Sequence, residues 1–306
     1  MDFFQTIFNE TGESAYRFFE ILTGPVMGSC FLLILFLFAV DIFRKGWDKA
    51  FTKRVVSGSF ASLAILILNI LFAPAVYILV AVLQSTYDFF QIPSIPTTFW
   101  DGTPFWLAAL IAIVAYDFAD YWNHRIMHTT WLWPIHAIHH SDKEVNGLTT
   151  FRVHFLEAVV MKGSYILLLS WAGFSPEAAT TGAVLLTMHN VYVHADIDWD
   201  HGPFKLLLAS PRFHRWHHAD VEEAYGKNLA NTFPFFDYIF GTYHEDGKCE
   251  AEMGVPGVPH ADVVSLMLYP FTEWSKGIQN YVNARRRVPK SDQQLTREIS
   301  EDTLQV

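Results

Sequence analysis

The chain has 306 residues and a formal net charge of −10, with 51% hydrophobic, 16% aromatic and 17% charged residues. Soluble domains carry about a quarter charged residues, so this composition favours a membrane protein. The acidic balance excludes a nucleic-acid partner, which would need a basic patch. Cys30 and Cys249 lie far apart in unlike surroundings, so the sequence predicts neither a disulfide nor a cysteine-based metal or redox motif.

The first hundred residues predict two membrane spans. Residues 21–40 carry no charge, and twenty such residues form a helix about 30 Å long, which matches the core of a bilayer. The charged residues among the twenty before this run are mainly acidic, whereas a cleavable signal peptide begins with a basic segment. The sequence therefore predicts no cleavable signal peptide. Residues 55–87 are also uncharged, and their length together with Pro74 predicts one tilted or kinked helix that extends beyond the bilayer core.

Basic residues set the predicted orientation in the membrane. The loop at 44–54 holds five Lys or Arg residues and is therefore expected in the cytoplasm, whereas the loop at 88–103 has none. A third span over residues 104–122 returns the chain to the cytoplasmic side. Residues 163–176 and 178–193 predict a helical hairpin that leaves and returns on this side, because a Ser-Pro-Glu turn signal separates them.

The histidines form three clusters that predict a metal site. The first is an H-x-x-x-H motif at the end of the third span, and two H-x-x-H-H motifs follow. In a helix, residues four apart share one face, while adjacent residues diverge by about 100°. Each adjacent pair can therefore send one imidazole to each of two metal ions. The eight predicted ligands are His124, His128, His136, His139, His140, His214, His217 and His218.

Nearby carboxylates are candidates for holding these ligands in place. Asp117 and Asp120 lie two turns and one turn before His124, on the same helical face. An unpaired carboxylate near the membrane is costly, and a hydrogen bond to a ligand histidine would stabilise it. Asp220 follows the third motif. Arg125 and Arg215 could bind a lipid head group or form ion pairs with Asp120 and Asp220, and the ion pairs are the preferred prediction.

Several metals accept imidazole ligands, including zinc, copper, iron and nickel. A structural zinc site needs only four ligands and usually contains cysteine, and a haem would not require two three-histidine motifs. Two iron ions fit best. The alternative is a histidine-rich membrane protein that binds or transports metal. Transporters usually place their ligands at the bilayer midplane, whereas these motifs flank the spans.

The sequence resembles the fatty acid hydroxylase and sterol desaturase superfamily from residue 116 to 243. The resemblance rests on the three motifs in order, on Ser210-Pro211-Arg212 before the third, and on the segment F-D-Y-I-F-G-T at 236–242. It implies an all-α integral membrane protein with about four transmembrane helices and a cytosolic helical cap. It also implies a non-haem centre of two iron ions that uses O2 to hydroxylate or desaturate a lipid of sterol or fatty-acyl type.

The resemblance implies electrons from NAD(P)H that arrive through a separate donor such as cytochrome b5, a ferredoxin or a reductase. No G-x-G-x-x-G motif follows a predicted strand, so neither tightly bound NAD(P)H nor haem is expected. His194 is implied as a ninth ligand, with His189 and Asn190 as further candidates, Asn190 through water. Thr129 stands where a related lipid-ether monooxygenase group carries Glu, which argues against that group's chemistry and pterin cofactor.

The predicted organisation has three parts. Residues 1–103 form a membrane region with two spans, residues 104–245 the histidine-box domain, and residues 246–306 a cytosolic tail. The protein is expected in the bacterial inner membrane or the endoplasmic reticulum, with several passes and its active site on the cytoplasmic side.

Overall fold

The computed structural model describes residues 24–287, and the regular elements of this part are all helical, as predicted. The longer helices are α2 (Pro25–Lys45), α4 (Lys53–Phe89), α5 (Phe105–Met127), α7 (Phe155–Ala172), α8 (Pro176–Val193) and α11 (Val263–Arg287). The shorter ones are α3 (Trp47–Ala50), α6 (Trp133–His140), α9 (Pro211–His218) and α10 (Phe235–Phe240). Four 3-10 turns are η1 (Thr97–Trp100), η2 (Gly147–Phe151), η3 (Gly202–Phe204) and η4 (Glu222–Ala224).

Three helices of the described part are long and apolar enough to cross a membrane, over Met27–Lys45, Lys53–Ala73 and Phe105–Met127. They overlap the three predicted spans, although the second candidate ends at Ala73 and residues 21–23 of the first prediction lie outside the described part. The helix α4 runs through Pro74 without a break for 37 residues, or about 56 Å. A single helix is therefore confirmed, whereas its tilt or kink and its extension beyond a bilayer core stay predictions.

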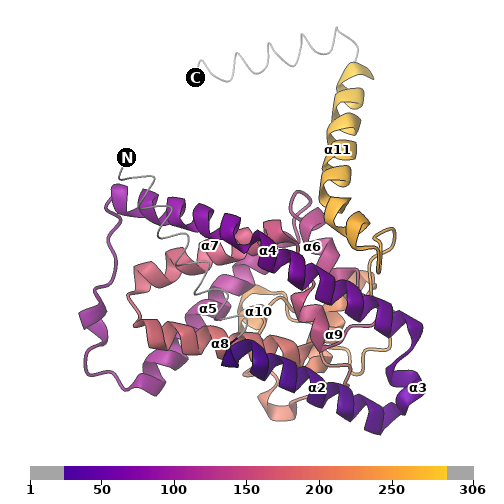
Figure 1. Ribbon diagram of the computed structural model, residues 1–306, viewed down its shortest axis with the longest axis horizontal. Coiled ribbons are helices and arrows are strands. Elements are labelled where there is room, and N and C mark those ends of the chain that lie inside the picture. Colours follow the sequence, from indigo (N-terminus) through magenta and orange to yellow (C-terminus); the bar gives the residue numbers. More distant parts are fainter. Residues whose placement is uncertain (1–23, 288–306) are drawn as a thin grey trace.

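The predicted hairpin forms as α7 and α8, each 18 residues long, and neither joins the three span candidates of the described residues. The start of α8 is fixed by Ser175, whose Oγ accepts a hydrogen bond from Ala178 N at 3.2 Å, with Pro176 in the first turn. The helix α5 packs against both arms of the hairpin, while α2 packs on α8 and α4 packs on α7 (Figure 1). The hairpin thus packs against all three span candidates.

The hairpin turn gives a test of this packing. Gly173 has a φ of +63°, and a Cβ there would collide with the carbonyl oxygen of Ile95. We expect Gly173→Ala to lower the free energy of unfolding by more than the ~1–2 kcal/mol that a left-handed L-residue costs. Gly202→Ala is the matched control, because its φ is +52° but nothing lies within 4 Å. Equal shifts of the thermal unfolding midpoint in detergent would contradict the predicted collision.

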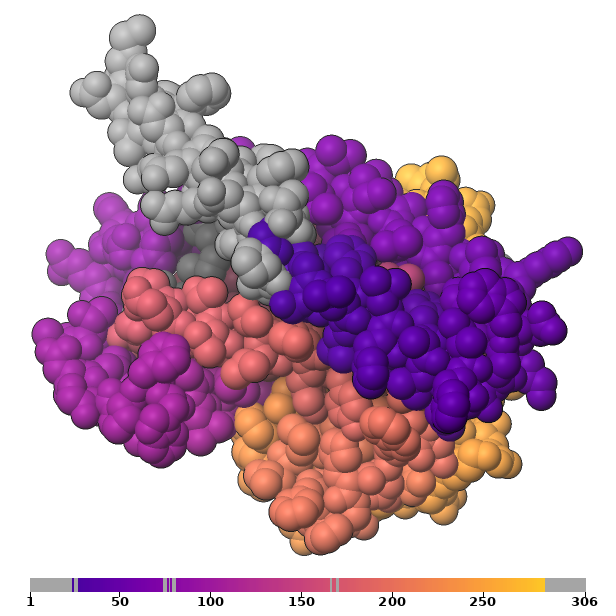
Figure 2. All heavy atoms as spheres, turned by 60° about the horizontal axis from the view of Figure 1, so that its bottom comes forward, coloured from indigo at the N-terminus to yellow at the C-terminus, as the bar shows by residue number. Residues whose placement is uncertain are grey.

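The histidine motifs lie where the spans end. The helices α6 and α9 carry the second and third motifs and have eight residues each. Figure 2 shows the chain after α8, in salmon and orange, as a lobe that projects beyond α2 and α8. A buried apolar cluster ties α6 to α4 and α11 through Ala137, Ile138, Ile65 and Leu266. The long helices therefore position short helices that carry the ligands.

Candidate metal centre

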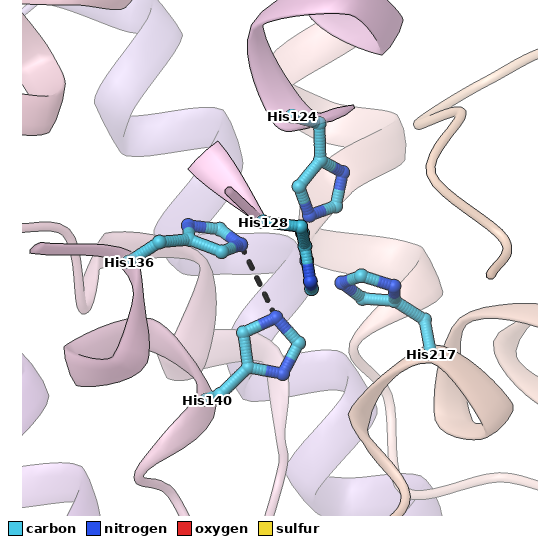
Figure 3. A group of neighbouring side chains, drawn as sticks. All are labelled: His124, His128, His136, His140 and His217. Carbon is cyan, nitrogen blue, oxygen red and sulfur yellow. Dashed lines mark hydrogen bonds between the residues drawn. The ribbon is translucent and has the colours of Figure 1, made fainter. Parts of the chain in front are cut away.

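Nine histidines converge into two buried or half-buried groups. In each group the donor nitrogens all lie within 4.8 Å of one another. Figure 3 shows the imidazoles of the larger group pointing toward a common centre from three parts of the chain. The five-histidine group consists of His124, His128, His136, His140 and His217, and the four-histidine group of His139, His194, His214 and His218.

The adjacent histidines separate as helical geometry predicts. His140 and His217 belong to the five-histidine group, and their neighbours His139 and His218 belong to the four-histidine group. The direction of the third motif depends on where α9 begins. Ser210 fixes this point, because its Oγ accepts a hydrogen bond from Phe213 N at 3.1 Å. The Ser-Pro-Arg sequence before the third motif is therefore a helix cap.

Backbone carbonyls and one carboxylate orient rings of the five-histidine group. His124 Nδ1 is 2.7 Å from Leu229 O, and His217 Nδ1 is 2.7 Å from Lys227 O. Each oxygen accepts the Nδ1 proton, which turns an Nε2 lone pair toward the group centre. The Nε2 atoms of His124 and His217 are buried and have no hydrogen-bond partner among the described residues. This arrangement is typical of imidazoles that bind a metal.

The four-histidine group brings ring nitrogens into direct contact. His194 Nδ1 donates to Asn190 O at 2.7 Å, and its Nε2 lies 3.2 Å from His139 Nε2 and 3.0 Å from His214 Nε2. Neutral nitrogens at these distances repel unless a cation or proton lies between them. Burial lowers the pKa of His194 to about 4 and that of His217 to about 3. Both rings are neutral at pH 7, the form that coordinates metals.

Two predicted residues lie beside the four-histidine group rather than in it. His189 Nδ1 is 3.1 Å from Asn231 O, and its Nε2 is buried without a hydrogen-bond partner among the described residues. The side-chain oxygen of Asn190 is buried in the same way. Asn190 lines a cavity of about 50 Å³ together with His139 and His194. Of these two residues, Asn190 lines a cavity together with members of the group.

The carboxylates predicted beside the first motif bond to other partners. The two oxygens of Asp117 accept hydrogen bonds from the backbone nitrogens of Thr232 and Phe233, at 2.8 and 2.7 Å. Asp120 accepts a hydrogen bond from the Tyr165 hydroxyl. Asp117 therefore holds the loop after the third motif rather than an imidazole.

The predicted ion pairs within the motifs are wrong. Arg125 donates to the Tyr121 hydroxyl at 2.9 Å, because five residues of helix turn it about 140° away from Asp120. Arg215 pairs with Asp196 at 2.8 Å. The backbone becomes extended at Ala219, directly after α9, which turns Asp220 away from Arg215.

Asp220 instead meets a tyrosine. Its carboxylate accepts a hydrogen bond from the Tyr225 hydroxyl at 2.6 Å. Both residues line the larger of two cavities beside the histidines. The contact therefore shapes a cavity wall.

Two residues that sequence reasoning missed support the second motif. Glu157 Oε1 accepts a hydrogen bond from His136 Nδ1 at 2.8 Å. Arg152 is fully buried and donates to Ile138 O at 3.1 Å and to Ser141 Oγ at 2.9 Å, at the end of α6. An acidic residue at the start of the apolar helix α7 was the available signal for Glu157.

Glu157 gives a graded test of ring orientation. Glu157→Leu removes the acceptor from His136 Nδ1, and loss of such a partner typically weakens metal binding about 10–100-fold. Glu157→Gln keeps an acceptor oxygen at this position, so we expect a smaller loss. The fraction of metal that each variant retains during titration with a chelator measures this difference in metal affinity. Equal retention in the parent protein and both variants would contradict an orienting role.

The larger cavity, of about 440 Å³, opens on another side of the histidines. Its wall contains members of both groups, His140 and His218, with Trp133, Val255 and Pro256 as apolar neighbours. A volume of this size is typical of a small-molecule site, whereas the cavity of about 50 Å³ has room for only a few water-sized molecules.

The comparisons with known proteins point to one family. Residues 109–242 match the fatty acid hydroxylase family. The chain is 28% identical to an ornithine lipid hydroxylase of Rhizobium tropici over 57% of its own length and 54% of the relative's. It is 29% identical to the alkylglycerol monooxygenase of Homo sapiens, over 57% of this chain and 36% of the relative.

A very-long-chain aldehyde decarbonylase of Oryza sativa subsp. indica is 30% identical, over 45% of this chain and 54% of the relative. The chain thus spans about half or less of the length of these relatives. No solved structure matches it significantly. The matched segment, residues 109–242, contains all nine clustered histidines.

Proposed function

We propose that this chain, whose residues 109–242 match the fatty acid hydroxylase family, is a membrane-bound non-haem di-iron oxygenase that hydroxylates or desaturates a lipid. The observation that carries the proposal is the pair of adjoining all-histidine groups, five imidazoles beside four. Imidazole suits iron, and iron is a redox-active metal that supports chemistry with O2. Two relatives named as a lipid hydroxylase and a monooxygenase support this reaction class.

The nine histidines are proposed to hold two iron ions, one in each group. When bound, iron supplies the O2 activation needed to attack an unactivated C–H bond. Glu157 and the carbonyls of Leu229 and Lys227 keep three of the rings in position. Asn190 is proposed to reach the four-histidine group through water. Rings held in this way need little rearrangement when metal or O2 binds.

The larger cavity is the proposed substrate chamber. It offers space beside His140 and His218, and its other walls include apolar groups such as Trp133 and Val255. The proposed occupant is a sterol or a fatty-acyl chain. The position of the target carbon relative to the two histidine groups would decide between hydroxylation and desaturation. Such reactions depend on atomic positions at the level of about an ångström.

Electrons are proposed to come from NAD(P)H through cytochrome b5, a ferredoxin or a reductase. For hydroxylation, one O2, two electrons and two protons convert a C–H bond into C–OH and release one water. Such a donor would meet the protein in the cytoplasm, on the side of the basic loop at 44–54.

Elemental analysis together with oxygen uptake tests the proposal. The protein, purified in mild detergent, should contain about two irons per chain, in line with its two groups, and consume O2 when reduced. Exchangeable zinc or copper, with no uptake after iron reconstitution, would favour a metal-binding or transport protein. One haem per chain would overturn the ligand assignment.

A further inference from the structure

The smaller cavity, of about 50 Å³, is lined by members of both histidine groups and by polar side chains. Three of these side chains, Glu157, Asn190 and Asn231, have buried atoms without a hydrogen-bond partner among the described residues. The atoms are Glu157 Oε2, Asn190 Oδ1 and both amide atoms of Asn231. Glu157 and Asn231 are only 3% and 4% accessible, so bulk water does not solvate them. A buried polar atom without a partner is costly, and each such atom needs an explanation.

Two ligand rings on the wall of this cavity lack an acceptor for their outer nitrogen. His139 and His214 approach His194 through Nε2, at 3.2 and 3.0 Å, and their Nδ1 atoms are buried without a partner in the described part of the chain. His194 itself donates from Nδ1 to Asn190 O. A histidine that binds metal almost always donates its second N–H to a carboxylate, a carbonyl or water. His139 and His214 therefore need acceptors that the described protein groups do not provide.

The size of the cavity identifies water as its ligand. A cavity needs about 10–15 Å³ of such volume to hold one water, so this cavity has room for a few. A lipid-sized ligand needs roughly 300 Å³ or more. A buried water typically makes about three hydrogen bonds. The wall offers a donor in Asn231 Nδ2 and acceptors in Glu157 Oε2 and Asn190 Oδ1.

Asn231 lies in a loop that is anchored on both sides of it. The backbone nitrogen of Ala230 donates to Asp237, and that of Thr232 donates to Asp117, both at 2.8 Å. The loop therefore fixes Asn231 at the cavity wall without using either of its amide atoms. A side chain held in this way is suited to binding a small ligand in one position.

We propose that the smaller cavity holds an ordered water cluster, anchored by Asn231, Glu157 and Asn190, that accepts the Nδ1 protons of His139 and His214. The waters thus orient two ligands of the four-histidine group, as backbone carbonyls orient ligands of the five-histidine group. Asn231 is a positioning residue in this arrangement, because it acts on the rings through water. The orienting role of the waters rests on the proposed metal function, whereas their presence does not.

Radiolytic footprinting of the full-length protein in detergent tests for the waters. The protein is loaded with zinc, which is not redox-active, so that the metal generates no radicals. X-rays convert bound water to hydroxyl radicals, which oxidise a neighbouring methionine to its sulfoxide. Met127 lines the cavity and is 1% accessible, whereas Met253 is 8% accessible and does not line it. We expect Met127 to be oxidised several-fold faster than Met253. Oxidation of Met127 no faster than that of Met253 would show a dry cavity and overturn the proposal.

The role of Asn231 is tested by Asn231→Leu, which removes both amide atoms and should slow the oxidation of Met127 several-fold. Thr232→Val is the matched control. Thr232 lies in the same loop, and its buried hydroxyl also lacks a partner among the described residues, but it does not line the cavity. This control should leave the oxidation of Met127 unchanged. An equal effect of the two variants would overturn Asn231 as an anchor of the waters.

Titration with a chelator tests the orientation of the rings. Asn231→Leu should lower the affinity for one of the two zinc ions about 10-fold, the lower end of the range for loss of an orienting partner, and Thr232→Val should lower neither. Unchanged zinc affinity in Asn231→Leu, together with slower oxidation of Met127, would overturn the orienting role. A parent protein that binds no zinc would overturn the proposed metal centre itself. The footprinting, which needs no bound metal, would then still decide whether the cavity holds water.

Discussion

His139→Ala is expected to reduce bound metal from about two ions per chain to about one and to lower turnover by at least ~10²-fold. His139 belongs to the smaller group, so its loss leaves only three imidazoles, His194, His214 and His218. Three ligands in a buried site leave one metal weakly held. Loss of a residue that only orients a ligand lowers metal affinity or activity about 10–100-fold, and loss of the ligand itself is expected to lower them more.

His217→Ala provides the informative comparison. His217 belongs to the five-histidine group, and four imidazoles remain after its loss. We expect this variant to retain more metal than His139→Ala while losing turnover. His201→Ala, outside both groups, should keep full metal and activity. Elemental analysis of membrane-inserted protein measures each case. Full iron with normal turnover in His139→Ala would remove this residue from the ligand set.

Much of this site was accessible from the sequence because it depends on local periodicity. The spacing of four puts His136 with His140, and the splay of adjacent residues sends His139 to the other group. Neither conclusion requires knowledge of how the helices pack. The three span candidates follow equally from long apolar runs, since the bilayer demands long apolar helices.

The supporting contacts were not accessible, because they join segments far apart in the sequence. Glu157 reaches His136 only after α7 packs near α6, and Leu229 O meets His124 from a loop about a hundred residues later. Sequence reasoning chose Asp120 for its helical spacing to His124. The folded chain instead points Asp120 at Tyr165, since that face of α5 packs on α7.

Asp237→Ala is expected to lower the free energy of unfolding by about 2–6 kcal/mol, because it leaves two buried backbone N–H groups without an acceptor. The carboxylate of Asp237 accepts hydrogen bonds from Leu229 N at 2.7 Å, Ala230 N at 2.8 Å and Thr242 Oγ at 2.6 Å. Thermal unfolding in detergent measures the loss. Asp246→Ala, at an exposed site, is the control and should leave the midpoint unchanged.

The same variant is expected to weaken metal binding, since the loop that Asp237 holds presents Leu229 O to His124. Asp117 holds the next residues of this loop through Thr232 N and Phe233 N. The two carboxylates thus fix one segment from two sides, and their effects on metal retention should not be additive. The double variant Asp117→Ala with Asp237→Ala is expected to lose less metal-binding free energy than the two single variants lose in sum. Strict additivity would show that each carboxylate acts alone and that the loop is not a single rigid support for the ring.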